Sequence, residues 1–153
     1  MTTRSRRSTT ASTRRRRHKG LVLDSWAVLA YLQGEDAAEH LADVLAEAIQ
    51  VEAPILMSVV NVGEVWYILA REVSTAEADK SIAALRSWGV EFVPADWTHA
   101  KEAALLKSRH RMSYADAFAA ALAKARKAEL VTGDLEFEQI GDYASIRWLR
   151  NEG

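Results

Sequence analysis

The chain has 153 residues, a net charge of −1 at neutral pH, no cysteine and four histidines. The lack of cysteine excludes disulfides, thiolate zinc sites and a cysteine nucleophile, and no apolar run reaches the roughly 20 residues that cross a bilayer. We therefore expect a soluble, cytoplasmic protein whose metal ligands, if it has any, are mainly oxygen atoms.

Residues 1–19 carry a strong positive charge, because they contain eight Arg or Lys residues and no acid. The rest of the chain has 12 basic and 21 acidic residues, a net charge of −9. Since almost nothing before Gly20 is apolar, we expect a disordered basic tail over 1–19 and one folded domain over 20–153. The tail is either an arm that attracts RNA or DNA phosphates, or a solubilising segment or extra residues from a misassigned start.

Apolar runs alternate with amphipathic segments from Gly20 onward, which is typical of a β-α-β chain. The predicted strands are Leu21 to Asp24, Ile55 to Ser58, Val90 to Val93, Leu130 to Thr132 and Ile146 to Leu149. The predicted helices cover residues 25–32, 36–49, 59–72, 75–88, 96–109 and 114–127. Because helices connect short apolar strands, we expect an α/β fold with a mostly parallel central sheet of four to five strands and helices on both faces.

Asp24 and Asp134 each lie at or just beyond the end of a predicted strand. The carboxyl ends of parallel strands meet at one edge of a sheet, where such folds bind ligands. Each acid also has a simpler interpretation when taken alone. Asp24 could cap the helix that follows it, and Asp134 could be an ordinary turn residue after Thr-Gly.

Asp116 and Glu64 lie on predicted helices. Asp116 is in the first turn of a helix opened by Ser113, so it could belong to a capping box. Glu64 is the single acid in the apolar segment 59–70, and no Lys or Arg lies three or four positions from it. We therefore predict that this helix is largely buried and that Glu64 is functional; the alternative is that Glu64 lies on a narrow exposed strip.

Together, the four acids predict a metal site. Clustered carboxylates repel one another unless a proton or a cation neutralises them, and a set of oxygen ligands favours Mg²⁺ or Mn²⁺ over zinc or copper. Magnesium sites commonly include phosphate oxygens, so phosphate chemistry is expected. The sequence contains neither a G-x-x-x-x-G-K-[ST] loop nor a G-x-G-x-x-G fingerprint, and Trp26 occupies the position where a haloacid-dehalogenase-like phosphatase carries its second Asp.

Four segments carry these acids in a characteristic order. They are Leu23-Asp24-Ser25, Asn61 to Val65, Ser113 to Phe118 and Thr132-Gly133-Asp134. Over about residues 20–150 the chain resembles the PIN-domain ribonucleases, and most closely the VapC-type toxins of bacterial toxin–antitoxin pairs. The most specific element is the Tyr-Ala-Asp-Ala-Phe segment with its alanine-rich helix, whereas the basic tail departs from the family pattern.

The resemblance implies a PIN-like three-layer sandwich and a metal-dependent endoribonuclease. Asp24, Glu64, Asp116 and Asp134 would form the catalytic and metal-binding site for Mg²⁺ or Mn²⁺. Asp24 and Asp116 would be direct ligands, and Glu64 and Asp134 would hold metal-bound water or a second ion. In the family's mechanism the ion positions and deprotonates a water for in-line attack on an RNA phosphodiester.

Two hydroxyl residues and two arginines are further candidates. Ser25 and Thr132 resemble the small hydroxyl residues that orient the carboxylates in this family, although capping or strand packing explains both equally well. Arg109 and Arg111 lie just before the Asp116 helix and could contact RNA phosphates. Their alternative role is a favourable charge near the end of the preceding helix.

The resemblance also implies two protein partners, a second copy in a homodimer and an antitoxin segment that lies in a groove and blocks the site. Trp26 and Trp66 lie on helices next to the acids and could line such a groove; core packing is the alternative. Two other functions stay open. A housekeeping RNA-processing PIN nuclease would have no antitoxin, and a catalytically silent nucleic-acid or protein-binding module would use the acids only as caps and turn residues.

Overall fold

Five short strands form the centre of the computed structural model, which describes residues 18–149. All neighbouring strands pair in parallel, and their order across the sheet is β3-β2-β1-β4-β5. The prediction of a sheet of four to five strands is confirmed, with every strand end within one residue of its expected position. The strands are β1 (Leu21–Leu23), β2 (Ile55–Ser58), β3 (Val90–Val93), β4 (Glu129–Thr132) and β5 (Ile146–Trp148).

The helices begin and end within two residues of the predicted limits. They are α2 (Ser25–Leu32), α3 (Ala38–Gln50), α4 (Val59–Glu72), α5 (Thr75–Ser87), α6 (Trp97–Arg109) and α7 (Tyr114–Arg126). A 3₁₀ segment, η1 (Leu135–Tyr143), was not predicted. Five helices start where a Ser or Asp side chain accepts a hydrogen bond from the first turn, which satisfies a backbone N–H that would otherwise lack a partner. These caps are Asp24, Ser58, Ser74, Asp96 and Ser113.

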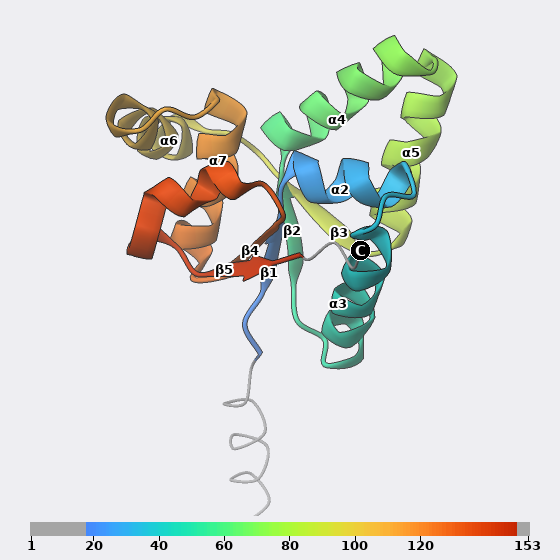
Figure 1. The fold of residues 1–153 in the computed structure, drawn as a ribbon, viewed down its shortest axis with the longest axis horizontal. Coiled ribbons are helices and arrows are strands. Elements are labelled where there is room, and N and C mark those ends of the chain that lie inside the picture. Colours follow the sequence, from blue (N-terminus) through green and yellow to red (C-terminus); the bar gives the residue numbers. More distant parts are fainter. Residues whose placement is uncertain (1–17, 150–153) are drawn as a thin grey trace, which may run out of the picture.

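The two faces of the sheet are covered by different helices (Figure 1). On one face, Leu21, Leu23 and Met57 pack in a core with α2 to α5. On the other face, Val22 and Leu56 pack with α6, α7 and η1. The neighbouring strands β1 and β2 are buried on both faces and contain no charged residue, as is usual for central parallel strands. The predicted three-layer sandwich is confirmed.

The strand order changes direction at β1. The chain builds outward from β1 through β2 to β3, and then returns to the other side of β1 to form β4 and β5. The edge beyond the carboxyl ends of β1 and β4 is therefore the topological switch point, where open α/β sheets form a crevice that binds ligands. Leu23 pairs with Val131 at this end, so Asp24 and the turn that carries Asp134 leave the sheet side by side.

Helix α7 is packed on nearly all sides, since every residue from Ala117 to Ala123 is buried. Five of these seven residues are alanines, and their small side chains let the helix lie close to the sheet and to its neighbours α4 and α6. This close packing places Asp116, in the first turn of α7, at the edge of the crevice.

Residues 1–17 and 150–153 lie outside the described part of the chain. The predicted disorder of the basic tail thus stays a prediction, because only His18 and Lys19 of that tail are described. Lys19 Nζ donates a hydrogen bond to Ser145 Oγ at 3.4 Å. Between residues 18 and 149, no helix combines the length and the apolar composition that a bilayer crossing requires.

Candidate metal centre

Asp24 lies directly after β1 and caps α2. Its Oδ1 accepts a hydrogen bond from the backbone N–H of Ala27 at 2.8 Å, and its Oδ2 accepts one from the Thr132 hydroxyl at 2.5 Å. The side chain is fully buried. Burial, with a smaller effect of the charges of Asp116 and Asp134, raises the pKa of Asp24 to about 8 despite these two hydrogen bonds. Asp24 is therefore both a helix cap and a buried acid with two acidic neighbours.

Asp116 is the third residue of α7 and is partly buried. Its backbone N–H donates to the hydroxyl of the cap residue Ser113 at 3.0 Å, so this capping bond does not use the carboxylate. Burial, together with the nearby charges of Asp134 and Glu64, raises the pKa of Asp116 to about 6. The charged groups that affect this carboxyl group among residues 18–149 are the acids Asp134, Glu64 and Glu136.

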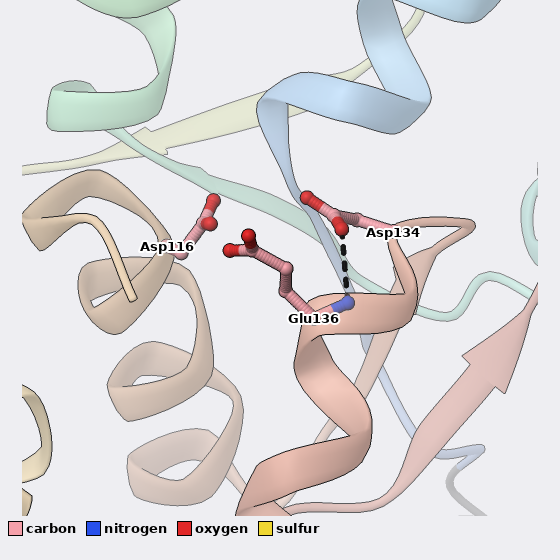
Figure 2. A group of neighbouring side chains, drawn as sticks. All are labelled: Asp116, Asp134 and Glu136. Carbon is pink, nitrogen blue, oxygen red and sulfur yellow. Dashed lines mark hydrogen bonds between the residues drawn. The ribbon is translucent and has the colours of Figure 1, made fainter. Parts of the chain in front are cut away.

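Asp134 is held by the turn that leads from β4 into η1. Its backbone N–H donates to Thr132 Oγ1 at 3.0 Å, and its Oδ1 accepts from the backbone N–H of Glu136 at 3.0 Å. Thr132 therefore connects Asp24 with Asp134. The tight turn brings the Glu136 side chain back across the crevice toward Asp116 (Figure 2).

Three carboxylates meet at this point. Asp116, Asp134 and Glu136 each offer one oxygen, and these three oxygens lie within 4.8 Å of one another (Figure 2). The group contains only carboxylate donors, which suit a hard cation such as Mg²⁺ or Mn²⁺ better than zinc or copper. The residues present therefore fit the kind of ion that the sequence predicts.

Glu136 was not among the predicted site residues. It is exposed, and it approaches Asp116 only because Asp134 opens a 3₁₀ turn. The signal that could have identified it is the spacing Asp134-Leu135-Glu136. An Asp that caps a helical turn places an acid two positions later in the first turn, close to the cap itself.

Glu64 lies in the second turn of α4, near enough to Asp116 to raise its pKa. The prediction that this helix is largely buried was wrong. Only four of its fourteen residues are buried, and Val59, Gly63 and Tyr67 are exposed. One face of α4 packs on the protein and the other is open to solvent, because apolar residues are not confined to the interior. Partly buried Glu64 lies at the boundary between these faces.

Thr132 and Ser25 differ in what their hydroxyl groups contact. Thr132 bonds a carboxylate directly, as the family resemblance implies. The Ser25 hydroxyl instead donates to the backbone carbonyl of Asn61 at 3.3 Å and accepts from its side-chain Nδ2 at 3.3 Å. The same Nδ2 donates to the carbonyl of Ala115 at 3.0 Å. Asn61 is fully buried, and its Oδ1 has no hydrogen-bond partner among the described residues.

The predicted RNA-contacting arginines lie at the end of α6 and in the turn after it. Both are exposed. The backbone of Arg111 is held by Gln139, whose Oε1 accepts from its N–H at 3.0 Å and whose Nε2 donates to its carbonyl at 2.9 Å. Nε2 of Gln139 also donates to the carbonyl of Glu136. The turn is thus fixed to the segment that carries Glu136, while Arg109 lies in the last turn of α6, where its charge also suits the helix end.

The two candidate groove tryptophans are both partly buried. The Trp26 ring lies over Gly133, so closely that a Cβ at Gly133 would overlap it. Trp66 Nε1 donates to Asp79 Oδ1 at 2.9 Å and so links α4 to α5. Each tryptophan therefore has a structural role, and the groove that they were expected to line stays a prediction.

A comparison with protein families finds one that spans most of the chain. The model of the family described as PIN domain matches residues 21–143. No curated protein matches the sequence significantly.

Solved structures of the same fold include proteins from three bacteria. VapBC2 from Rickettsia felis, bound to a DNA fragment from its promoter, has a TM-score of 0.67 and 16% identity over 85% of this chain and 98% of that chain. DNA-bound VapBC from Salmonella typhimurium has a TM-score of 0.67 and 15% identity over 87% of this chain and 100% of that chain. VapC20 from Mycobacterium tuberculosis, described as a sarcin-ricin loop cleaving toxin, has a TM-score of 0.58 and 20% identity over 80% of this chain and 95% of that chain. At these identities the similarity is one of fold.

Proposed function

Because the chain belongs to the PIN-domain family, we propose that it is a metal-dependent endoribonuclease and the toxin of a toxin–antitoxin pair. The observation that carries this proposal is the convergence of Asp116, Asp134 and Glu136 at the switch point of the sheet, with one oxygen of each within 4.8 Å of the others. Buried Asp24 lies beside them. Acids with raised pKa values in such a crevice are typical of a functional site.

We assign the acids different roles in this site. Asp116, Asp134 and Glu136 would hold the divalent ion, and Asp24 would contribute an oxygen, since each carboxylate oxygen accepts more than one bond. Glu64 would hold water at the rim of the group. A bound Mg²⁺ or Mn²⁺ would lower the pKa of a coordinated water and stabilise negative charge on the phosphate oxygens.

The raised pKa values of Asp24 and Asp116 have a chemical consequence for this role. Without a cation, the two carboxyl groups keep their protons at pH values well above those at which an ordinary carboxyl group loses its proton. Burial and their acidic neighbours disfavour the charged forms. Ligation requires the carboxylates, so binding of the ion would release protons. Metal affinity should therefore increase as the pH rises toward 8.

RNA is the proposed substrate, with Arg109 and Arg111 contacting its phosphates. These contacts would supply affinity with little sequence selectivity, because phosphate contacts do not distinguish bases. The sarcin-ricin loop cleaving activity named for VapC20 supports RNA as substrate. The VapBC complexes of Rickettsia felis and Salmonella typhimurium support an antitoxin as partner. A homodimer is proposed on the family resemblance alone.

The nuclease proposal is tested with purified protein and structured RNAs, in the presence and absence of Mn²⁺. We expect cleavage that needs the ion and is lost in Asp116→Asn. The matched control is Asp96→Asn, because Asp96 also lies at a helix start but only caps α6 through the backbone N–H of His99. Cleavage without a divalent ion, or equal cleavage by wild type and Asp116→Asn, would contradict the mechanism.

The toxin proposal needs a different experiment, because a housekeeping nuclease would also cleave RNA in a metal-dependent way. Expression of the wild-type chain should arrest bacterial growth, and expression of Asp116→Asn should not. The toxin proposal also requires a small antitoxin gene beside this one, and co-expression of its product should restore growth. If the wild-type chain cleaves RNA and yet leaves growth unchanged, the housekeeping alternative is favoured.

A further inference from the structure

We infer that Asn61 is a positioning residue that sets the spacing of the acids at the metal centre. This inference rests on the proposed metal-dependent function. Asn61 makes three hydrogen bonds to two groups on two other helices, the Ser25 hydroxyl and the Ala115 carbonyl, and each of these residues lies next to a proposed metal ligand. We assign it an indirect role, through the backbone segments that carry the acids.

The hydrogen bonds of Asn61 join three helix starts. A reciprocal pair with Ser25 fixes the first turn of α4 to the first residue of α2. The bond from Nδ2 to the carbonyl of Ala115 fixes α4 to the first turn of α7. Both hydrogens of the amide nitrogen are used, one for each neighbouring helix.

Each of these three helix starts carries one of the predicted acids. Asp24 precedes Ser25, and Asp116 follows Ala115. Glu64 lies three positions after Asn61, on the helix turn that stacks on it. A single side chain therefore links the backbone segments that present three of the four acids.

The fourth acid is connected by a second hydroxyl group. Thr132 donates to Asp24 and accepts from the backbone N–H of Asp134. The Asn61 bonds and the Thr132 bonds thus meet at Asp24 and its neighbour Ser25. Together they form one path of hydrogen bonds from α4 and α7 to the turn after β4.

The side-chain amide of Asn61 makes hydrogen bonds that an apolar side chain at this position cannot make. Asn61 is fully buried and leaves Oδ1 unpaired, which costs stability. Valine or leucine would avoid that cost but would donate no hydrogen bond to Ser25 or Ala115. The acids at the centre repel one another, so without these bonds α2, α4 and α7 are freer to move apart. A looser set of ligands binds an ion more weakly, since residues that orient ligands contribute to metal affinity.

The test is a titration of metal-free protein with Mn²⁺, in which electron paramagnetic resonance reports the free ion. In Asn61→Ala we expect the Mn²⁺ affinity to fall roughly tenfold, in the range known for residues that support metal ligands. Ser25→Ala removes the hydrogen bonds between Ser25 and Asn61 but leaves the bond from Asn61 to Ala115, so we expect a smaller loss of Mn²⁺ affinity. The matched control is Val62→Ala, which truncates the next residue on α4, a buried apolar side chain that packs in the core.

All variants are compared at a temperature at which circular dichroism shows them to be folded. Unchanged affinity in folded Asn61→Ala and Ser25→Ala would overturn the inference. An equal loss in Val62→Ala would also overturn it, because the effect would then come from lower stability alone. If Asn61→Ala does not fold, the Mn²⁺ affinities of Ser25→Ala and Val62→Ala are compared instead. A greater loss in Ser25→Ala supports the inference, and an equal loss overturns it. A wild-type chain that binds no Mn²⁺ would overturn the proposed function, and the inference with it.

Discussion

The hydroxyl of Thr132 donates a hydrogen bond to the carboxylate of Asp24 across 108 positions of sequence. The bond lowers the pKa of Asp24, against the larger opposite effect of burial. Thr132 therefore favours the charged form of an acid that its surroundings would keep protonated, and a charged carboxylate is the form that binds a metal ion.

Replacing Thr132 with valine should raise the pKa of Asp24 further above its present value of about 8. Valine has a similar shape but donates no hydrogen bond, so the charged carboxylate loses a stabilising contact. The measurement is a carbon-13 NMR titration of the carboxyl group in EDTA. Thr132→Ser keeps the donor and should titrate as wild type does; a raised pKa in the serine variant would mean that packing, and not the bond, is responsible.

The metal-free protein should become less stable as the pH rises from about 4 to about 8. Asp24 binds its proton far more tightly in the folded chain, where its pKa is about 8, than at the ordinary pKa of 3.8. The pKa of Asp116 in the folded chain is about 6. The stabilisation that these two protons give is complete below pH 4 and is lost as the pH rises through the pKa values of the folded chain. Fully buried Asp24 lowers the free energy of unfolding by roughly 1.4 kcal/mol per pH unit over this range, and Asp116, which is partly exposed and screened by solvent, lowers it by less.

Urea denaturation in EDTA between pH 4 and pH 8 measures this dependence. Asp24→Asn carries no titrating group at position 24, so its stability should depend less on pH than that of wild type. Addition of Mn²⁺ at pH 8 should restore stability to the wild type, because the ion binds only the folded site. A free energy of unfolding that increases over this pH range would contradict the raised pKa values.

Glu136→Gln should weaken Mn²⁺ binding by roughly tenfold, because the variant replaces one of three converging carboxylates with a neutral amide. Glu138→Gln is the control, since Glu138 is an exposed acid two positions further along η1 and is not in this group. Calorimetric titration of both variants gives the comparison. Equal affinities in the two variants would show that Glu136 is a bystander.

Gly133→Ala should destabilise the protein by roughly 1–3 kcal/mol, because the added methyl group overlaps the Trp26 ring in a packed site. Gly63→Ala makes the same chemical change on α4, where the new group meets no atom within 4 Å among the described residues, apart from its chain neighbours and the backbone of its own helix. It should stabilise the chain by roughly 0.5–1 kcal/mol, as expected for alanine in a helix. Urea denaturation of the two variants isolates the effect of the contact with the Trp26 ring. Equal destabilisation of both variants would contradict this explanation.

Arg111→Gln should weaken RNA binding and reduce its dependence on salt. Loss of one phosphate contact to single-stranded RNA lowers the slope of log affinity against log salt by roughly 0.7. Binding is measured in EDTA, where the proposed nuclease cannot act, at several salt concentrations. Lys80→Gln removes an exposed charge on α5 and should leave the slope unchanged; equal slopes in both variants would place Arg111 outside the RNA site.

The positions of strands and helices were predictable because each has a local signal. Apolar runs such as Ile55–Ser58 mark strands buried on both faces, and Asp or Ser side chains mark the helix starts. The burial of α4 was not predictable in this way, because composition does not reveal which neighbours cover a helix. Its apolar residue Tyr67 is 48% exposed although the helix pattern suggests a buried position.

The candidate site was predicted in part. The acids Asp24 and Asp134 could be placed together, because strand ends meet at one edge of a parallel sheet. Glu136 could not, since its approach to Asp116 depends on the fold of η1, which has no strong sequence pattern. The hydrogen bonds of Asn61 also lie beyond sequence reasoning, because they join residues 36 and 54 positions apart.

The pairing of β1 with β4 also sets when the site can exist. Asp24 is synthesised well before β4 and Asp134. A growing chain on the ribosome therefore keeps Asp24 and Asp134 apart until β4 inserts beside β1, a contact of long sequence separation that is expected to form late. The repulsion between these two carboxylates, and any nuclease activity, would then arise only after β4 has been made and paired.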